Sequence, residues 1–189
     1  MWELCTDFAA TVVEHWPIWL VTVVLIVSAV IDGFELRVPN LITYPFIISG
    51  WVYSFYAGGF YGLGWSLAAT ALGMSILLLF YSFGGMGAGD VKLMAGVAAW
   101  IHWTNTYNCI LGFAIVGMLM AIGMVLVRGK WNHHYKQFWL IAREIATIKD
   151  PDKLSEIAAQ RKPTMMLLPY GIPIAVATIG YFLWTGMLV

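Results

Sequence analysis

Long apolar runs alternate with short polar or glycine-rich breaks along the chain. An apolar run close to bilayer-spanning length can satisfy its own backbone hydrogen bonds by forming a helix. We therefore predict an all-α, polytopic membrane protein with about six transmembrane helices. The expected spans are Trp16–Val30, Leu41–Tyr56, Leu63–Phe83, Val91–Trp100, Tyr107–Val127 and Met165–Leu188, of which the fourth is the shortest.

The positions of the cations predict how these helices are oriented. With six spans, all ten lysines and arginines fall on one side of the membrane: Arg37, Lys92 and the eight in the segment Arg128–Lys162. The positive-inside rule makes that side cytoplasmic. We expect a multi-pass protein of the bacterial inner (cytoplasmic) membrane, with its N-terminus outside.

One extended polar region, Arg128–Pro163, interrupts the apolar pattern. Its apolar and cationic residues recur at helical spacing, which predicts an amphipathic helix at the cytoplasmic membrane surface. Asp150 and Pro151 then offer an N-cap and a first-turn proline for a second short helix through Leu154–Gln160. Without an internal linker or repeat, we expect residues 1–189 to form a single membrane-embedded domain.

Composition supports a membrane protein and argues against several other classes. The chain is 61% hydrophobic and 11% charged, and its mean hydropathy is +0.80, which is unlike a soluble domain. A net charge of zero gives no basic excess for binding nucleic acid. Cys5 and Cys109 have no metal-ligand spacing, and Glu3 and Asp7 stand where a secretory signal would carry cations, so we expect no cleaved signal peptide.

Two carboxylates at the ends of apolar helices are candidates for function, because burying a charge in lipid is costly. Asp32 ends the first predicted span and Asp90 begins the fourth, and the topology puts both at one depth. Two carboxyls at a shared site do not both ionise easily, so one keeps a proton and the other can activate a water molecule. The alternative for each aspartate alone is an interfacial carboxylate with a structural partner.

Glycines 84, 85, 87 and 89 precede Asp90. They permit close approaches that a Cβ atom would forbid, as a turn beside an extended peptide requires. Glycine-rich breaks between membrane helices also commonly serve packing, so the glycines alone do not decide between the two interpretations.

Three segments in the expected order resemble the type IV prepilin peptidases, membrane aspartic proteases of the GxGD type. Asp32–Asn40 resembles the family's aspartate motif that ends in Ile-Pro-Asn, with Val38 in place of isoleucine. Gly87–Leu93 (Gly-Ala-Gly-Asp-Val-Lys-Leu) matches GxGDxKL in full. Leu168–Pro173 (Leu-Pro-Tyr-Gly-Ile-Pro) resembles the element that opens the last helix of the family.

The resemblance implies that Asp32 and Asp90 are the catalytic pair, that Gly87 and Gly89 shape the active-site turn, and that no cofactor or metal is needed. Its supporting motif residues are Pro39, Asn40, Lys92, Pro169 and Gly171. From the residues themselves, we expect Pro39-Asn40 to begin the second helix and Lys92 to be a snorkelling interfacial lysine rather than a catalytic group.

The resemblance also implies a substrate. Many family members carry an N-terminal methyltransferase region with paired CxxC motifs, whereas only about fifteen residues precede the first span here. Such short forms resemble the peptidases of tight-adherence (Flp-type) pili, so we expect cleavage of prepilins or pseudopilins without N-methylation. Their leader junction would lie at the inner membrane face. The lipid bilayer and other pilus or secretion assembly proteins are the remaining expected partners.

Two other classes are possible from the residues alone. In a transporter, Asp32 and Asp90 would relay protons or bind a cation, but a relay should place its carboxylates near the midplane. A non-catalytic scaffold should tolerate aspartate-to-asparagine changes. His133-His134 lacks further ligands at metal spacing, and Glu35 is expected to be a solvated loop carboxylate.

Overall fold

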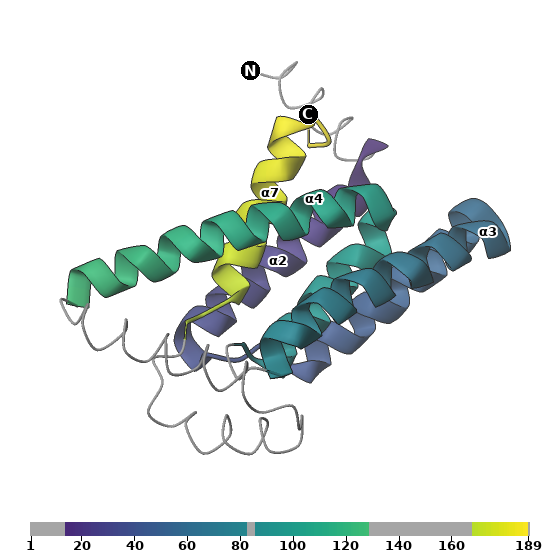
Figure 1. Cartoon of the computed structure of the whole chain (residues 1–189). Coiled ribbons are helices and arrows are strands. Elements are labelled where there is room, and N and C mark those ends of the chain that lie inside the picture. The colour runs from purple at the N-terminus through teal and green to yellow at the C-terminus, as the bar shows by residue number, and fades with distance from the viewer. Residues whose placement is uncertain (1–13, 83–85, 129–167, 189) are drawn as a thin grey trace.

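The computed structural model describes residues 14–82, 86–128 and 168–188 of the chain, and within these ranges its regular elements are all helices (Figure 1). The elements are α2 (Trp16–Glu35), α3 (Asn40–Ser82), α4 (Ala88–Arg128) and α7 (Gly171–Trp184). Three of them, α2, α3 and α4, contain stretches long and apolar enough to cross a membrane, and α7 is a shorter apolar helix. The all-α prediction is confirmed for these ranges. The predicted amphipathic segment lies outside the described residues.

Helix α3 folds back on itself at Gly59. This residue has φ 59° and ψ −149°, a backbone conformation that is essentially restricted to glycine. The indole N–H of Trp51 donates to Thr70 Oγ1 over 3.1 Å, across 19 residues. An unbroken helix would separate these two residues by about 28 Å, so α3 is a hairpin of two helices, as Figure 1 shows.

Helix α4 changes direction at His102, which has φ 61° and ψ 177°. The carbonyl oxygen of Ala99 lies in the last turn before this break, where helix carbonyls lose their intrahelical partners. Two buried hydroxyls of α3 donate to it instead, Ser54 Oγ over 3.3 Å and Ser66 Oγ over 2.6 Å. The α3 hairpin thereby stabilises the end of the first part of α4.

The two breaks fall between predicted spans. Gly59 separates the second span from the third, and His102 separates the fourth from the fifth. Helix α2 begins at Trp16 as predicted but continues five residues beyond Val30, to Glu35. It ends where Leu36 turns left-handed, with φ 53° and its N–H bonded to the Asp32 carbonyl. The count of six membrane crossings stays a prediction.

The first part of α4 is the most deeply buried stretch of the described chain. From Val91 to Ile101 every residue except Lys92 is buried. Helix α3 approaches this stretch closely, because a Cβ on Gly50 would lie 2.8 Å from Ala99 Cβ and one on Gly73 would lie 3.2 Å from Ala98 Cβ. Small residues at helix contacts permit such close packing.

The second part of α4 packs against α7, which also lies beside α2. Ring centroids of Phe113 and Tyr170 are 6.3 Å apart, and a Cβ on Gly112 would lie 3.4 Å from Ala177 Cβ. The end of α2 meets the beginning of α7, so these two helices run in opposite directions (Figure 1).

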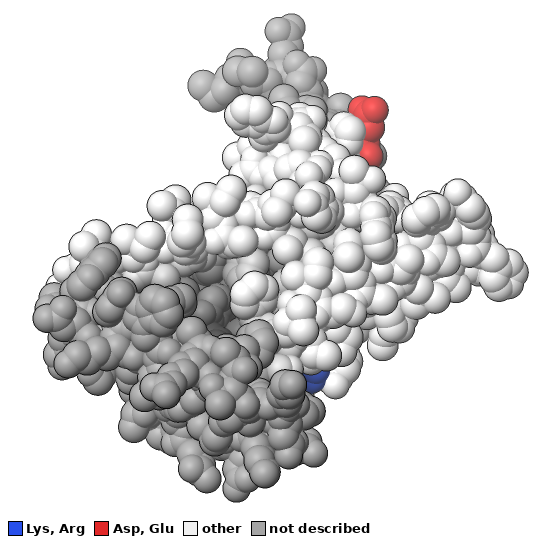
Figure 2. Space-filling view, viewed as in Figure 1, with Lys and Arg blue, Asp and Glu red and all other residues white. Residues whose placement is uncertain are grey.

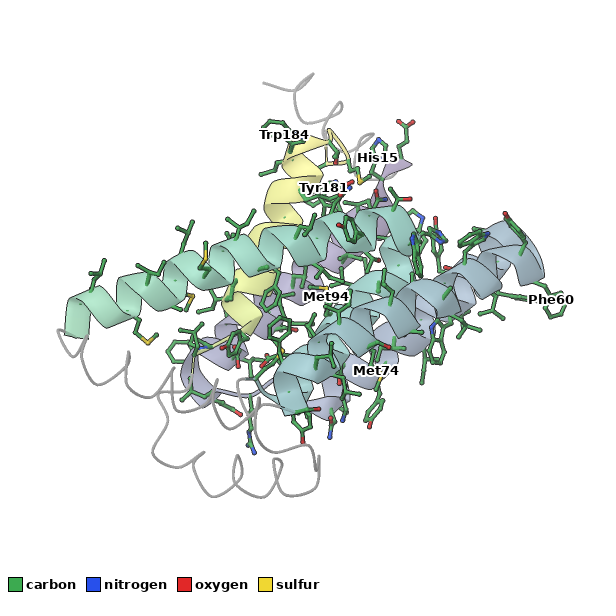
Figure 3. The ribbon with its side chains drawn as sticks, viewed as in Figure 1. His15, Phe60, Met74, Met94, Tyr181 and Trp184 are labelled. Atoms are coloured by element: carbon green, nitrogen blue, oxygen red, sulfur yellow. The ribbon has the colours of Figure 1, made fainter. Side chains whose placement is uncertain are left out.

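The outer surface of the described chain is strongly apolar. Phe60 and Trp184 are 83% and 90% exposed, and both point away from the helices in Figure 3. In the face drawn in Figure 2, the acidic colour lies near the N-terminal end and the basic colour near the opposite end, with an uncharged surface between them. Such a surface suits a lipid environment better than water.

Candidate active site

The first candidate catalytic carboxyl, Asp32, is fixed by the beginning of α7. Asp32 lies in the last turns of α2 and is only 2% exposed. Its Oδ2 atom accepts a hydrogen bond of 2.7 Å from the backbone N–H of Gly171, one of the N–H groups that a helix leaves without an intrahelical partner at its start. A Cβ on Gly171 would lie 2.9 Å from Asp32 Cβ and 3.0 Å from Oδ2. This close approach requires glycine.

The second candidate, Asp90, lies in the first turn of α4 and is 5% exposed. Its Oδ2 atom accepts a hydrogen bond of 3.2 Å from the backbone N–H of Gly87. Its Oδ1 atom is buried and has no hydrogen-bond partner among the described residues. One oxygen is therefore anchored, and the other is left for a group that the described chain does not supply.

The structure brings the two carboxyls into one site. They are close enough for the charge of Asp32 to act on the carboxyl of Asp90, although 58 positions of the sequence separate them. Tyr170 lies within electrostatic reach of Asp90 as well and directly precedes Gly171. Three elements, α2, α4 and the beginning of α7, thus converge on this point.

Three contacts join the segment after Asp32 to the residues on either side of Asp90. A Cβ on Gly89 would lie 2.6 Å from the carbonyl oxygen and 3.0 Å from the nitrogen of Val38, so this turn packs directly on backbone. Lys92 Nζ donates to Asn40 Oδ1 over 2.9 Å and lies 4.7 Å from the centre of the Tyr44 ring. Together these contacts hold the start of α3 against the start of α4.

The two supporting prolines stand close to the starts of helices. The carbonyl of Pro39 accepts the N–H groups of Ile42 and Thr43 over 3.1 and 3.3 Å, and the carbonyl of Pro169 accepts that of Ile172 over 3.2 Å. Pro39 therefore precedes α3, which begins at Asn40, and Pro169 belongs to the turn that leads into α7.

Comparison with known proteins identifies the family. Residues 19–122 match the sequence model of the type IV leader peptidase family, which is more than half of the chain. The chain belongs to the type IV leader peptidase family. No solved structure matches it.

Several curated proteins are similar to this family member. The prepilin leader peptidase/N-methyltransferase of Aeromonas hydrophila is 34% identical over 122 residues, which are 61% of this chain and 41% of that protein. The corresponding protein of Aeromonas salmonicida (strain A449) is 32% identical over 61% of this chain and 40% of its own length. That of Pectobacterium carotovorum subsp. carotovorum is 27% identical over 57% and 40%. The aligned region thus spans about two fifths of these relatives.

Sequence reasoning alone left one part of the site unassigned in this member of the type IV leader peptidase family. The anchor of Asp32 is the N–H of Gly171, a backbone group whose partner cannot be read from residue types. The Pro-Tyr-Gly-Ile-Pro element in the sequence indicated that this segment belongs to the site, but not that the Gly171 N–H bonds to Asp32. Glu35 pairs with Arg37 over 3.2 Å at the surface, as a solvated carboxylate should.

Five further residues that the sequence brings into consideration lie outside the described part of the chain. They are Gly84 and Gly85 of the glycine turn, Cys5, and the adjacent histidines His133 and His134. Within the described part, no group of three or more His, Cys, Asp or Glu side chains could hold a metal ion.

Proposed function

We propose that this chain is an aspartic endopeptidase that removes the leader peptide from Flp-like prepilins or pseudopilins at the cytoplasmic membrane face. The similar Aeromonas proteins are prepilin leader peptidases by name, which supports the substrate class. The observation that carries the proposal is the convergence of Asp32 and Asp90, two buried carboxyls that interact electrostatically.

The anchoring of the carboxyls suits this chemistry. One oxygen of each carboxyl is held by the N–H of a glycine, while the unpartnered Oδ1 of Asp90 is available to a water molecule. Two buried carboxyls that interact electrostatically hold one proton between them more readily than they carry two charges. The pair can therefore act as general base and general acid at the same time.

The proposed reaction proceeds in two steps. The ionised carboxyl takes a proton from water as the water oxygen bonds to the scissile carbonyl carbon, and the protonated carboxyl gives its proton to the carbonyl oxygen. The tetrahedral intermediate then breaks its C–N bond: the protonated carboxyl gives its proton to the amine nitrogen, and the ionised carboxyl takes a proton from a hydroxyl of the intermediate. One proton again remains on the pair, which is its starting state. Neither step requires a metal ion or a covalent nucleophile.

The positions of the two carboxyls also bear on how the chain is placed in the membrane. Asp32 lies near the end of α2 and Asp90 at the start of α4, so both belong to helix ends rather than to the middle of a span. We propose six crossings of the bacterial inner membrane, with the breaks at Gly59 and His102 on the outer side and the carboxyls on the cytoplasmic side. A proton relay would need carboxylates nearer the midplane.

Co-expression with a Flp-type prepilin tests the proposal. Wild-type protein should shorten the prepilin at its leader junction, as measured by mass spectrometry. Asp32→Asn and Asp90→Asn should each lower the rate at least about 1000-fold, because each removes one half of the acid–base pair.

Glu35→Gln is the matched control, since Glu35 is an exposed carboxylate three residues from Asp32. It should cleave at the wild-type rate. Cleavage by both asparagine variants, or by no form of the protein against several prepilins, would contradict the proposal and favour a scaffold or a transporter.

A further inference from the structure

An apolar groove of about 670 Å³ runs between α2 and α7 on the outside of the described helices. Every residue that lines it is aliphatic, aromatic or glycine. Several of its side chains are well exposed, among them Val176 at 53% and Phe34 at 87%. Since the groove offers no polar side chain, its occupant must itself be apolar.

One end of the groove meets the candidate active site. Gly33 and Ile172 both line the groove, and each directly follows a partner in the Asp32–Gly171 hydrogen bond. From this end the lining residues of α7 continue to Leu183. Ile172 and Leu183 are eleven positions apart, which corresponds to about 16 Å of helix, or three turns. The groove is therefore long enough for about three turns of a second helix.

Glycines make the groove hollow. A Cβ on Gly180 would meet no atom within 4 Å, and one on Gly33 would meet only Ile172 Cδ1, at 3.7 Å. A side chain at Gly180 would therefore start in open space, and we expect a large one to occupy the groove. Neither glycine is needed for a close contact inside the fold. Their effect is therefore to keep the groove open.

We propose that this groove binds the apolar helix of the prepilin, directly after the leader junction. The inference rests on the proposed function and adds to it the surface on which the substrate packs. A helix in the groove is continuous with the site, because its end beside Gly33 and Ile172 delivers the adjoining peptide to Asp32. The proposed occupant is thus an apolar helix whose chain becomes extended and polar at the end beside Gly33 and Ile172.

A second apolar pocket is the alternative binding site for the prepilin helix. It lies between α3 and α4, has about 360 Å³, and is lined by residues such as Met118 and Tyr170. Its volume is little more than half that of the groove, so it offers less room for a helix. Met118 is 57% exposed, which makes it comparable with Val176 as a probe position.

Filling the groove is the first test. Gly180→Leu should lower kcat/KM for a full-length prepilin in proteoliposomes at least about tenfold, mainly through a higher KM, because the leucine occupies the space of the substrate helix. Gly64→Leu is the control, since Gly64 is also an exposed helical glycine whose Cβ would meet nothing within 4 Å. This control should leave kcat/KM unchanged.

Photo-crosslinking is the second test and does not depend on how the leucine variants fold. In an Asp90→Asn background, a photoreactive amino acid at Val176 should crosslink to the prepilin helix, whereas one at Met118 should not. Crosslinking at Met118 alone, crosslinking at Val176 to lipid alone or to a second copy alone, or equal kcat/KM for both leucine variants would overturn the groove proposal. If the wild-type protein still cleaves prepilin when the groove proposal is overturned, the proposed function stands and only the groove proposal fails. If the wild-type protein cleaves no prepilin, the proposed function itself fails.

Discussion

Asp32 and Asp90 are each held through one oxygen by the backbone N–H of a glycine. The two anchors differ in their surroundings. Gly171 is pressed against the Asp32 side chain itself, with 2.9 Å between its ideal Cβ position and Asp32 Cβ, whereas Gly87 belongs to the same turn as Asp90. The Asp32 anchor therefore couples two segments that are far apart in the sequence, and a small change at Gly171 should be transmitted to the carboxyl.

We predict that Gly171→Ala lowers kcat about a hundredfold with little change in KM. The added methyl group would push the Asp32 carboxyl aside, and a displacement near 1 Å is enough for a loss of about this size. Gly123→Ala is the control, because a Cβ at Gly123 would meet nothing within 4 Å. Steady-state cleavage of a prepilin, with thermal unfolding to check the fold, measures the effect. Wild-type kcat in Gly171→Ala would show that this contact does not position Asp32.

The sequence could predict the two aspartates but not all of their surroundings. Carboxylates at the ends of apolar runs are conspicuous because such runs otherwise exclude charge, and this singled out Asp32 and Asp90. The contact of Gly89 with Val38 backbone and the N–H of Gly171 involve main-chain atoms, which every residue type carries. Residue patterns contain no signal for such partners, so only the structure shows them.

At the scale of elements, hydropathy predicted the helices better than their ends. Helix α2 continues to Glu35 although Asp32 and Gly33 interrupt the apolar run. The reversal at Gly59 could be anticipated from the neighbouring glycines. The break at His102 lies in the predicted gap between Trp100 and Tyr107, but hydropathy could not predict that this residue would turn, since a positive φ is uncommon outside glycine. The hydroxyls of Ser54 and Ser66 that satisfy the Ala99 carbonyl beside the break could not be predicted either.

We predict that His102→Gly stabilises the protein. His102 has φ 61°, which costs a residue with a Cβ about 1–3 kcal/mol, and glycine removes this strain at a smaller cost in chain entropy. A net gain of about 1 kcal/mol would raise the midpoint of thermal unfolding by about 2–4 °C. Thermal unfolding in detergent measures it.

Thr104→Gly provides the contrast. Thr104 is exposed, lies two residues further on in the helix and has no positive φ, so glycine there should lower the midpoint. If both variants lower it by similar amounts, His102 is not strained in the folded protein.

At the scale of the whole molecule, the carboxyls and the Gly59 turn lie at opposite ends of the first helix of the α3 hairpin. Asn40 at its start bonds to Lys92, two residues after Asp90, whereas Gly59 lies at the far end of its first helix. The first helix of α3, residues 40–58, is about 28 Å long, close to the thickness of the hydrocarbon layer. The fold thus separates the site from the turn by about one membrane, which is the arrangement that the distribution of cations in the sequence also favours.

Cysteine labelling therefore reports the orientation of the site. In a variant without Cys5 and Cys109, Phe60→Cys should react with a membrane-impermeant maleimide in intact spheroplasts, because Phe60 is 83% exposed beside the Gly59 turn, which we propose to lie outside. Arg37→Cys should react only after the membrane is permeabilised, since the Arg37 side chain is 77% exposed at the end that carries Asp32. The reverse pattern would put both carboxyls outside, where a prepilin leader retained in the cytoplasm could not reach them, and cleavage by this pair would then be excluded whatever the geometry of the site.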